Sequence, residues 1–268
     1  PKPRDIHKAP VRDRLVHHAV YRILYPYFDR QFIHDSYSCR LGKGTHRAIY
    51  RLKTFTDKAS RNNTRTVYIL KGDIRKFFAN IDHGVLKGLL GTHIRDTDTL
   101  WLLGQLIDSF HTEGKTNMGL PLGNLTSQLF VNIYMNEFDQ FVKRTLRIQY
   151  YARYADDFVI VHESKTYLER LIPKLSAFLE TTLKLTLHPD KLYIKTLASG
   201  VDFLGWINFP HHRIPRTSTK HRMFRKLRQH SSKESLASYL GMLSHGNTFK
   251  LAQSIKKQYL SDENSVLM

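Results

Sequence analysis

Residues 148–163 read IQYYARYADDFVIVHE and place two adjacent acids, Asp156 and Asp157, between two apolar runs. The aromatic and β-branched residues on both sides predict two strands with the acids at the connecting turn. Aspartate is common in turns, so the pair by itself fits an ordinary hairpin. A chain with 42 Lys and Arg against 23 Asp and Glu nevertheless sets two acids together here. Whether they form a turn or a site depends on the rest of the sequence.

The bulk composition points to a globular protein that binds a polyanion. The chain has 268 residues, 41% of them hydrophobic, and a formal charge of +19. Its basic residues occur throughout, densest at 1–53 and 211–230, which favours nucleic acid over a membrane surface. The alternative is a merely solvated basic surface. No apolar run approaches the roughly 20 residues that span a bilayer. Cys39 is the only cysteine, which excludes an intrachain disulfide and a thiolate zinc site.

The periodicity of apolar residues predicts an alternation of helices and strands. We expect a helix over 13–32, a strand over 65–74, a buried helix over 98–110, a helix over 125–145, a hairpin over 148–162, a helix over about 165–184, strands near 191–195 and 201–208, and basic helices from about 217. This order suits a split β-α-β sheet with helices on one face, an α+β arrangement.

Asp73 ends the predicted strand over 65–74, where an acid lies at the edge of the sheet. The hairpin can bring Asp156 and Asp157 beside it. Three carboxylates within about 4–5 Å repel each other by roughly 4 kcal/mol per pair at an effective dielectric near 20. Mg²⁺ is the natural compensating charge, and two ions bridged by Asp73 and Asp156 suit an in-line phosphoryl transfer. The alternative is that these acids lie far apart, since sequence spacing does not fix their distance.

Five segments, in order, resemble motifs of reverse transcriptases. They are LKGDIRKFFANID (70–82), GLPLGNLTSQLFVNIYMNEFDQFV (119–142), YADD (154–157), HPDKLYI (188–194) and GVDFLGW (200–206). The resemblance covers essentially the whole chain. It implies a right-hand polymerase with partial, N-terminally incomplete fingers over 1–64, a ferredoxin-like split β-α-β palm over 65–210 with inserted finger and helical segments, and a small helical thumb over 211–268.

Within that superfamily the sequence is most similar to the enzymes of diversity-generating retroelements. Three segments have sequences typical of that group: residues 2–21, 35–46 and 123–128. This resemblance implies an RNA-directed DNA polymerase that copies a template RNA with errors at adenines. The alternatives are a reverse transcriptase of a retron, group II intron-like or CRISPR-associated system, and a non-catalytic nucleic-acid-binding protein on the same scaffold.

The resemblance also assigns roles to single residues. It implies Asp73, Asp156 and Asp157 as catalytic acids and Lys191 as the proton donor to pyrophosphate. It implies Asp73, Asp156 and Asp157 as metal ligands, with the backbone carbonyl of Ile74 as an extra one. It further implies Arg4, Phe78, Leu122 and Gly123 as nucleotide-binding residues, and Phe203, Leu204 and Gly205 as the primer grip. Phe78 matches the steric gate that rejects ribonucleotides. The alternatives are that Phe78 is an ordinary core residue and that Lys191 packs on a helix surface.

Leu122 departs from related enzymes, which carry a glutamine there. Losing one polar contact should weaken discrimination between correct and incorrect pairs by about 1–3 kcal/mol. The resemblance further implies two Mg²⁺ ions, with Mn²⁺ as a substitute, and dNTPs, template RNA and a primer or cDNA as partners. It also implies a basic oligomeric accessory protein, no membrane association and a cytoplasmic location for a bacterial, archaeal or phage-encoded protein.

Overall fold

The computed structural model describes residues 6–7, 9–229 and 232–266 of the chain. Along this part the elements run α1 (Val11–Asp29), α2 (Thr45–Ala59), β1 (Tyr68–Asp73), α3 (His83–His93), α4 (Thr97–Asp108), α5 (Leu125–Gln140), β2 (Tyr151–Tyr154), β3 (Asp157–His162), α6 (Lys165–Leu183), β4 (Tyr193–Thr196), β5 (Val201–Phe203), β6 (Trp206–Asn208), β7 (Arg213–Pro215), α7 (Thr217–Gln229), α8 (Lys233–Leu243) and α9 (Phe249–Val266). Short 3₁₀ turns follow β1, precede β4 and follow β4, and a π-helical turn ends α5.

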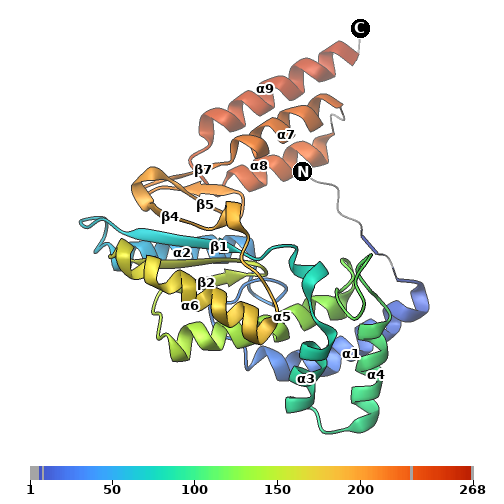
Figure 1. Cartoon of the computed structure of the whole chain (residues 1–268). Helices are drawn as coiled ribbons and strands as arrows, with labels where there is room; N and C mark the ends of the chain where they lie inside the picture. Colours follow the sequence, from blue (N-terminus) through green and yellow to red (C-terminus); the bar gives the residue numbers. More distant parts are fainter. Residues whose placement is uncertain (1–5, 8, 230–231, 267–268) are drawn as a thin grey trace.

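The centre of the described chain is a four-stranded antiparallel sheet in the order β2-β3-β1-β4 (Figure 1). Its strands and the crossing helices follow in the order β1-α5-β2-β3-α6-β4, the connection of a β-α-β-β-α-β unit. The predicted split β-α-β sheet is therefore confirmed, with α3 and α4 inserted between β1 and α5.

The two faces of this sheet pack against different layers. Leu70, Phe158 and Ile160 lie in the core that α5 and α6 complete. Ile69 and Val159 lie in a second core with α2 and the small sheet β5-β6-β7. The prediction of helices on one face only is thus wrong, because α2 covers the other. Side chains alternate along a strand, so Lys71, Asp73 and Asp157 point to the same side as Ile69 and Val159.

Gly72 has a packing reason to lack a side chain. It is the register partner of Phe158, whose ring lies directly over it. A Cβ on Gly72 would lie 2.2 Å from Cζ of Phe158, closer than carbon atoms approach. This glycine lets the aromatic ring close the core one residue before Asp73.

The outer helices are packed in two groups. α4 buries only one face, with Leu103 and Ile107 inside and Trp101 66% exposed, so the prediction of a buried helix there is only half right. Helices α7, α8 and α9 share a small core of their own around Met223, Leu243 and Ile255. Figure 1 shows this group beyond the small sheet, away from α3 and α4. Among the described helices, none combines the length and the apolar character that a membrane crossing needs.

Candidate active site

Asp156 lies in a tight turn between β2 and β3. Tyr154 and Asp157 are register partners, so only Ala155 and Asp156 connect the two strands. Ala155 has a φ of 55°, in the left-handed region that residues with a Cβ rarely adopt. The amide of Ile74, just after β1, donates a hydrogen bond to the Asp156 carbonyl over 3.1 Å. The turn is therefore strained and anchored to the end of β1.

The strands bring the predicted acids together. Asp73 and Asp157 are register partners on β1 and β3, and Asp156 precedes Asp157 in the turn. Lys191 donates from Nζ to both carboxylate oxygens of Asp73, at 3.0 Å each. Lys71 places its Nζ 3.2 Å from Oδ1 of Asp157. Two lysines thus offset charge that the acids accumulate at this end of the sheet.

The surroundings of Asp157 strongly perturb the pKa of its carboxyl. Burial raises the pKa of its carboxyl to about 7, the Lys71 ammonium opposes this rise, and the negative charges of Asp73 and Asp156 add to it. Its Oδ1 is buried, and although Lys71 is near enough for an ion pair, the angle gives that oxygen no hydrogen bond. Asp157 is therefore an acid whose environment calls for additional positive charge.

The chemistry of this oxygen-rich cluster fits a hard divalent cation. In the described part of the chain, however, no three His, Cys, Asp or Glu side chains stand ready to hold a metal ion. The Lys191 ammonium bridges both oxygens of Asp73, so a cation already occupies the position of a metal at this carboxylate. Metal ligation by Asp73, Asp156 and Asp157 stays a prediction, and it requires that Lys191 move aside.

The acids open into a cleft of about 730 Å³. Most of the predicted nucleotide-binding and primer-grip residues line it as well: Phe78, Leu122, Gly123, Leu204 and Gly205, together with the predicted catalytic Lys191. Leu204 and Gly205 form the turn between β5 and β6 with φ angles of 52° and 91°. Segments far apart in the sequence thus meet around one cavity, although the role of each residue remains a prediction.

Three predicted site residues lie elsewhere or outside the described residues. The side chain of Phe203 is fully buried in the core between the sheets, so it supports the β5–β6 turn from behind. The Ile74 side chain is buried in the core with α5 and α6, but the predicted metal ligand is its backbone carbonyl; its amide bonds the Asp156 carbonyl, and the ligand role stays a prediction. Arg4 lies outside the described residues.

Sequence reasoning missed several lining residues, of which Lys71 is the clearest. Lys71 precedes Asp73 by two positions, so strand alternation alone places it on the same face, and this signal was available in the sequence. Asp202 and Arg216 also line the cleft and form an ion pair with each other. Their meeting depends on the β5-β6-β7 sheet, which short strands with little pattern did not reveal.

A second groove, of about 1080 Å³, continues from this cleft along α7. Gly205 and Arg216 line both cavities, and Arg222, Arg225 and Arg228 follow along the helix. None of the residues described along this groove is acidic. The acids therefore lie at one end of a groove that arginines line.

Comparison with known proteins agrees with this geometry. The family model described as "Reverse transcriptase (RNA-dependent DNA polymerase)" matches residues 1–208. The chain belongs to the reverse transcriptase family. This match spans the four-stranded sheet, its helices and most of the residues that line the cleft.

Two curated relatives of this reverse transcriptase are similar over most of the chain. Protein YkfC of Escherichia coli (strain K12) is 29% identical, over 76% of this chain and 62% of its own length. The group II intron-encoded protein LtrA of Lactococcus lactis subsp. cremoris is 25% identical, over 72% of this chain and 42% of its own length. The chain thus spans roughly half the length of these relatives.

Solved structures with the same fold include yeast telomerases. Apo telomerase from Candida tropicalis superposes with a TM-score of 0.60 at 13% identity, covering 95% of this chain and 50% of that one. Telomerase from Candida albicans, in complex with a fragment of telomeric RNA, gives a TM-score of 0.56 at 11% identity, covering 94% of this chain and 46% of that one. At such identities the likeness concerns the fold alone.

Proposed function

We propose that this chain is an RNA-directed DNA polymerase with fingers over 1–64, a palm over 65–210 and a thumb over 211–268. The observation that carries the proposal is the pairing of Asp73 with Asp157 at the floor of a cleft that Phe78, Leu122 and Lys191 also line. Together with membership of the family, it supports template-directed phosphoryl transfer.

Asp73 and Asp156 would hold two Mg²⁺ ions, with Mn²⁺ as a substitute. When bound, such ions activate the attacking hydroxyl and stabilise the leaving oxygen of an in-line displacement. The Lys191 ammonium, 3.0 Å from both oxygens of Asp73, is a donor that can protonate the departing pyrophosphate. Phe78 would press against the 2′ position of the sugar and exclude ribonucleotides, and Leu122 with Gly123 would form the apolar wall beside the dNTP.

The nucleic acid would lie in the cleft and along α7. Arg222, Arg225 and Arg228 line the groove that continues from the cleft, and guanidinium groups are suited to backbone phosphates. We propose a template RNA paired with a primer or cDNA as the occupant. The basic oligomeric accessory protein stays part of the proposal for the retroelement, and its binding surface is not assigned.

We infer further that the enzyme serves a diversity-generating retroelement and copies adenines with errors. Two observations support this. The first is the similarity of residues 2–21, 35–46 and 123–128 to that group, and the second is the aliphatic Leu122 on the wall of the cleft. A second candidate is a group II intron-like enzyme, which the similarity to LtrA favours. The genes beside this one discriminate the two, because a diversity-generating cassette carries a template repeat and a matching variable repeat.

The deciding experiment is primer extension on an RNA template with and without Mg²⁺, followed by sequencing of the product. Asp156→Asn should lower the rate about 1000-fold or more, since metal-ion stabilisation contributes several kcal/mol. Asp190→Asn is the matched control, because Asp190 lines the same cleft but belongs to no predicted metal set. RNA affinity, measured by fluorescence anisotropy, should be the same in all three proteins.

The outcomes separate the candidate functions. Adenine-directed substitutions in the cDNA support the retroelement enzyme, whereas faithful copies support the group II intron-like one. RNA binding without any Mg²⁺-dependent synthesis by the wild-type chain would leave a non-catalytic binding protein on a polymerase scaffold.

A further inference from the structure

A fully buried arginine lies directly behind the turn that carries Asp156. The Arg153 side chain has no exposed surface, although it is the longest cationic side chain available and sits on a strand of the central sheet. Its partner is Asp139 of α5, equally buried, which accepts from Nε and Nη2 at 2.7 Å each. This is a bidentate, charge-assisted pair.

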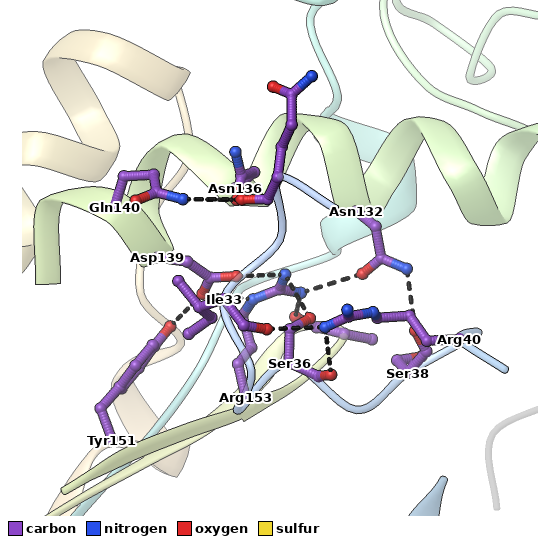
Figure 2. A network of polar contacts seen from close by, with 12 residues as sticks. Ile33, Ser36, Ser38, Arg40, Asn132, Asn136, Asp139, Gln140, Tyr151 and Arg153 are labelled. Atoms are coloured by element: carbon purple, nitrogen blue, oxygen red, sulfur yellow. Dashed lines mark hydrogen bonds and ion pairs between the residues drawn. The ribbon is translucent and has the colours of Figure 1, made fainter. Parts of the chain in front are cut away.

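Every N–H of this guanidinium has an acceptor. Besides the two bonds to Asp139, Nη2 donates to Oγ of Ser36 at 3.1 Å, and Nη1 donates to Oδ1 of Asn132 at 3.5 Å and to the Ala155 carbonyl at 2.9 Å. Figure 2 shows the guanidinium between α5, the segment around Ser36 and the β2 strand. Five donors in a rigid fork thus reach four groups on three separate segments.

Further contacts hold both the Arg153 guanidinium and its partner carboxylate in place. Tyr151 donates from its hydroxyl to Oδ1 of Asp139 over 2.6 Å, so that the carboxylate cannot rotate freely. The Arg153 amide donates to the Asp35 carbonyl at 3.0 Å, and the Tyr37 amide donates to the Arg153 carbonyl at 2.9 Å. The segment after α1 is therefore paired with the edge of β2, and Arg153 is held by its backbone as well as its side chain.

The bond to the Ala155 carbonyl has a specific consequence for Asp156. In a two-residue hairpin turn the central peptide can flip, and the flip changes the φ of the second residue from negative to positive. That central peptide joins Ala155 to Asp156, and its carbonyl is the group that Arg153 holds. The next peptide is held from the other side, because the Ile74 amide donates to the Asp156 carbonyl over 3.1 Å. Both peptides that flank Asp156 are thus clamped.

We propose that Arg153 is a positioning residue of the polymerase, which fixes the Ala155–Asp156 peptide and so sets the direction in which the Asp156 carboxylate enters the cleft. The inference rests on the proposed function. Lysine cannot replace the fork, because a single ammonium cannot hold both oxygens of Asp139 and the Ala155 carbonyl in fixed directions. The rival explanation is that the Arg153–Asp139 pair serves stability alone.

A triple substitution separates the two explanations. Arg153→Met with Asp139→Leu and Tyr151→Phe replaces the buried polar set by apolar side chains of similar size, an exchange that often leaves stability unchanged or improved. Among the contacts of the turn, the folded triple variant lacks the bond to the Ala155 carbonyl and the attraction between the Arg153 charge and Asp156. Arg153→Lys is the second variant, since it keeps a charge beside Asp139 and does not depend on repacking. Ser36→Ala is the matched control, because it removes one bond of the same guanidinium and leaves the one to Ala155.

The experiment measures kcat and KM for dNTP in primer extension, the affinity for primer–template, and the thermal midpoint of each variant. We expect kcat to fall about 100-fold in the triple variant and in Arg153→Lys, as for a reacting group displaced by about 1 Å, with KM, primer–template affinity and Ser36→Ala unchanged. A wild-type kcat in either folded variant overturns the inference, as does a kcat loss that merely follows the fraction unfolded. An inactive wild-type chain instead contradicts the proposed function.

Discussion

Asp73 and Asp157 are register partners on neighbouring strands, yet a different lysine holds each carboxylate. Lys191 reaches Asp73 from the short turn before β4 and is half exposed, whereas Lys71 reaches Asp157 from within β1 and is buried. The first contact can open toward solvent, and the second cannot do so without rearranging the sheet. Lys71 is therefore the permanent counter-charge of this site.

Replacing Lys71 by methionine should destabilise the protein by about 3–5 kcal/mol, because the buried charge of Asp157 then has no partner. Urea unfolding in EDTA at about pH 8 measures the change in the free energy of unfolding. The control is Lys53→Met, which breaks the exposed pair with Asp57 four residues along α2 and should cost about 0.3–0.5 kcal/mol. Equal effects of the two substitutions would show that the Lys71 pair is not buried as described.

Leu122→Gln should improve discrimination against mismatches at template adenines by about 1–3 kcal/mol, or about 5–150-fold, because it restores a polar contact beside the nucleotide. Sequencing of cDNA from an adenine-rich RNA template gives the substitution frequency. Leu122→Met keeps the wall apolar and should leave that frequency as in the wild type. An unchanged frequency in Leu122→Gln contradicts the proposed role of this residue.

Phe78→Val should raise incorporation of ribonucleotides by about 10-fold or more, since the pocket then no longer rejects the 2′-hydroxyl sterically. Competition between dNTP and rNTP in primer extension measures this ratio. Phe77 is the internal control: its ring is buried in the core, so Phe77→Ala should cost about 3–5 kcal/mol of stability. If the Phe77 substitution altered sugar selection while Phe78→Val did not, the assignment of the gate would be reversed.

The free energy of unfolding should decrease as the pH is lowered, because of His17. Burial lowers the pKa of its ring below 6.5, and its Nδ1 lies 2.8 Å from Oγ1 of Thr126 on α5. The unfolded chain takes up a proton near pH 6.5 while the folded chain resists it, so the contribution is present above that pH and is lost as the pH falls toward the folded value. His17→Gln should flatten this pH dependence of the free energy of unfolding.

His18→Gln, at the exposed neighbour, is the control for His17. Urea unfolding at about pH 8 and about pH 5.5 should give the same difference in this control as in the wild type. A pH dependence that survives in His17→Gln would assign the effect to another group.

The sequence predicted the hairpin, the strand that carries Asp73 and several of the residues that line the cleft, because these follow from local alternation and from contiguous motifs. It did not predict α3, where Gly84, Gly88 and Gly91 lower the helix propensity and tertiary packing supplies the stability. It missed α2 as well, although Ala48, Ile49, Leu52 and Phe55 recur at helical spacing. Lys71 and Arg153 were missed for another reason.

The burial of Arg153 depends on partners distant in the sequence. Asp139 is 14 positions away and Ser36 is 117, so no local pattern indicates that this arginine has left water. Strand alternation places Lys71 on the same face as Asp73, but its burial as a cation arises only when β1 pairs with β3. The burial of a charged residue on a strand can be predicted from the sequence only where the position of its counter-charge can be predicted as well.

The cleft and the groove along α7 share lining residues. This continuity affects how long a growing cDNA would stay bound to the protein. Gly205 and Arg216 line both cavities, and arginines continue along the helix, so under the proposed function a duplex that leaves the acids would still be bound through its phosphates. Phosphate contacts weaken steeply as salt rises, because they depend on the release of counterions. Bond formation would take place beside Asp73 and Asp157, whose side chains are only 10% and 15% exposed, so that salt screens their charges much less. Added salt should thus shorten the cDNA made in one encounter well before it slows the joining of each nucleotide.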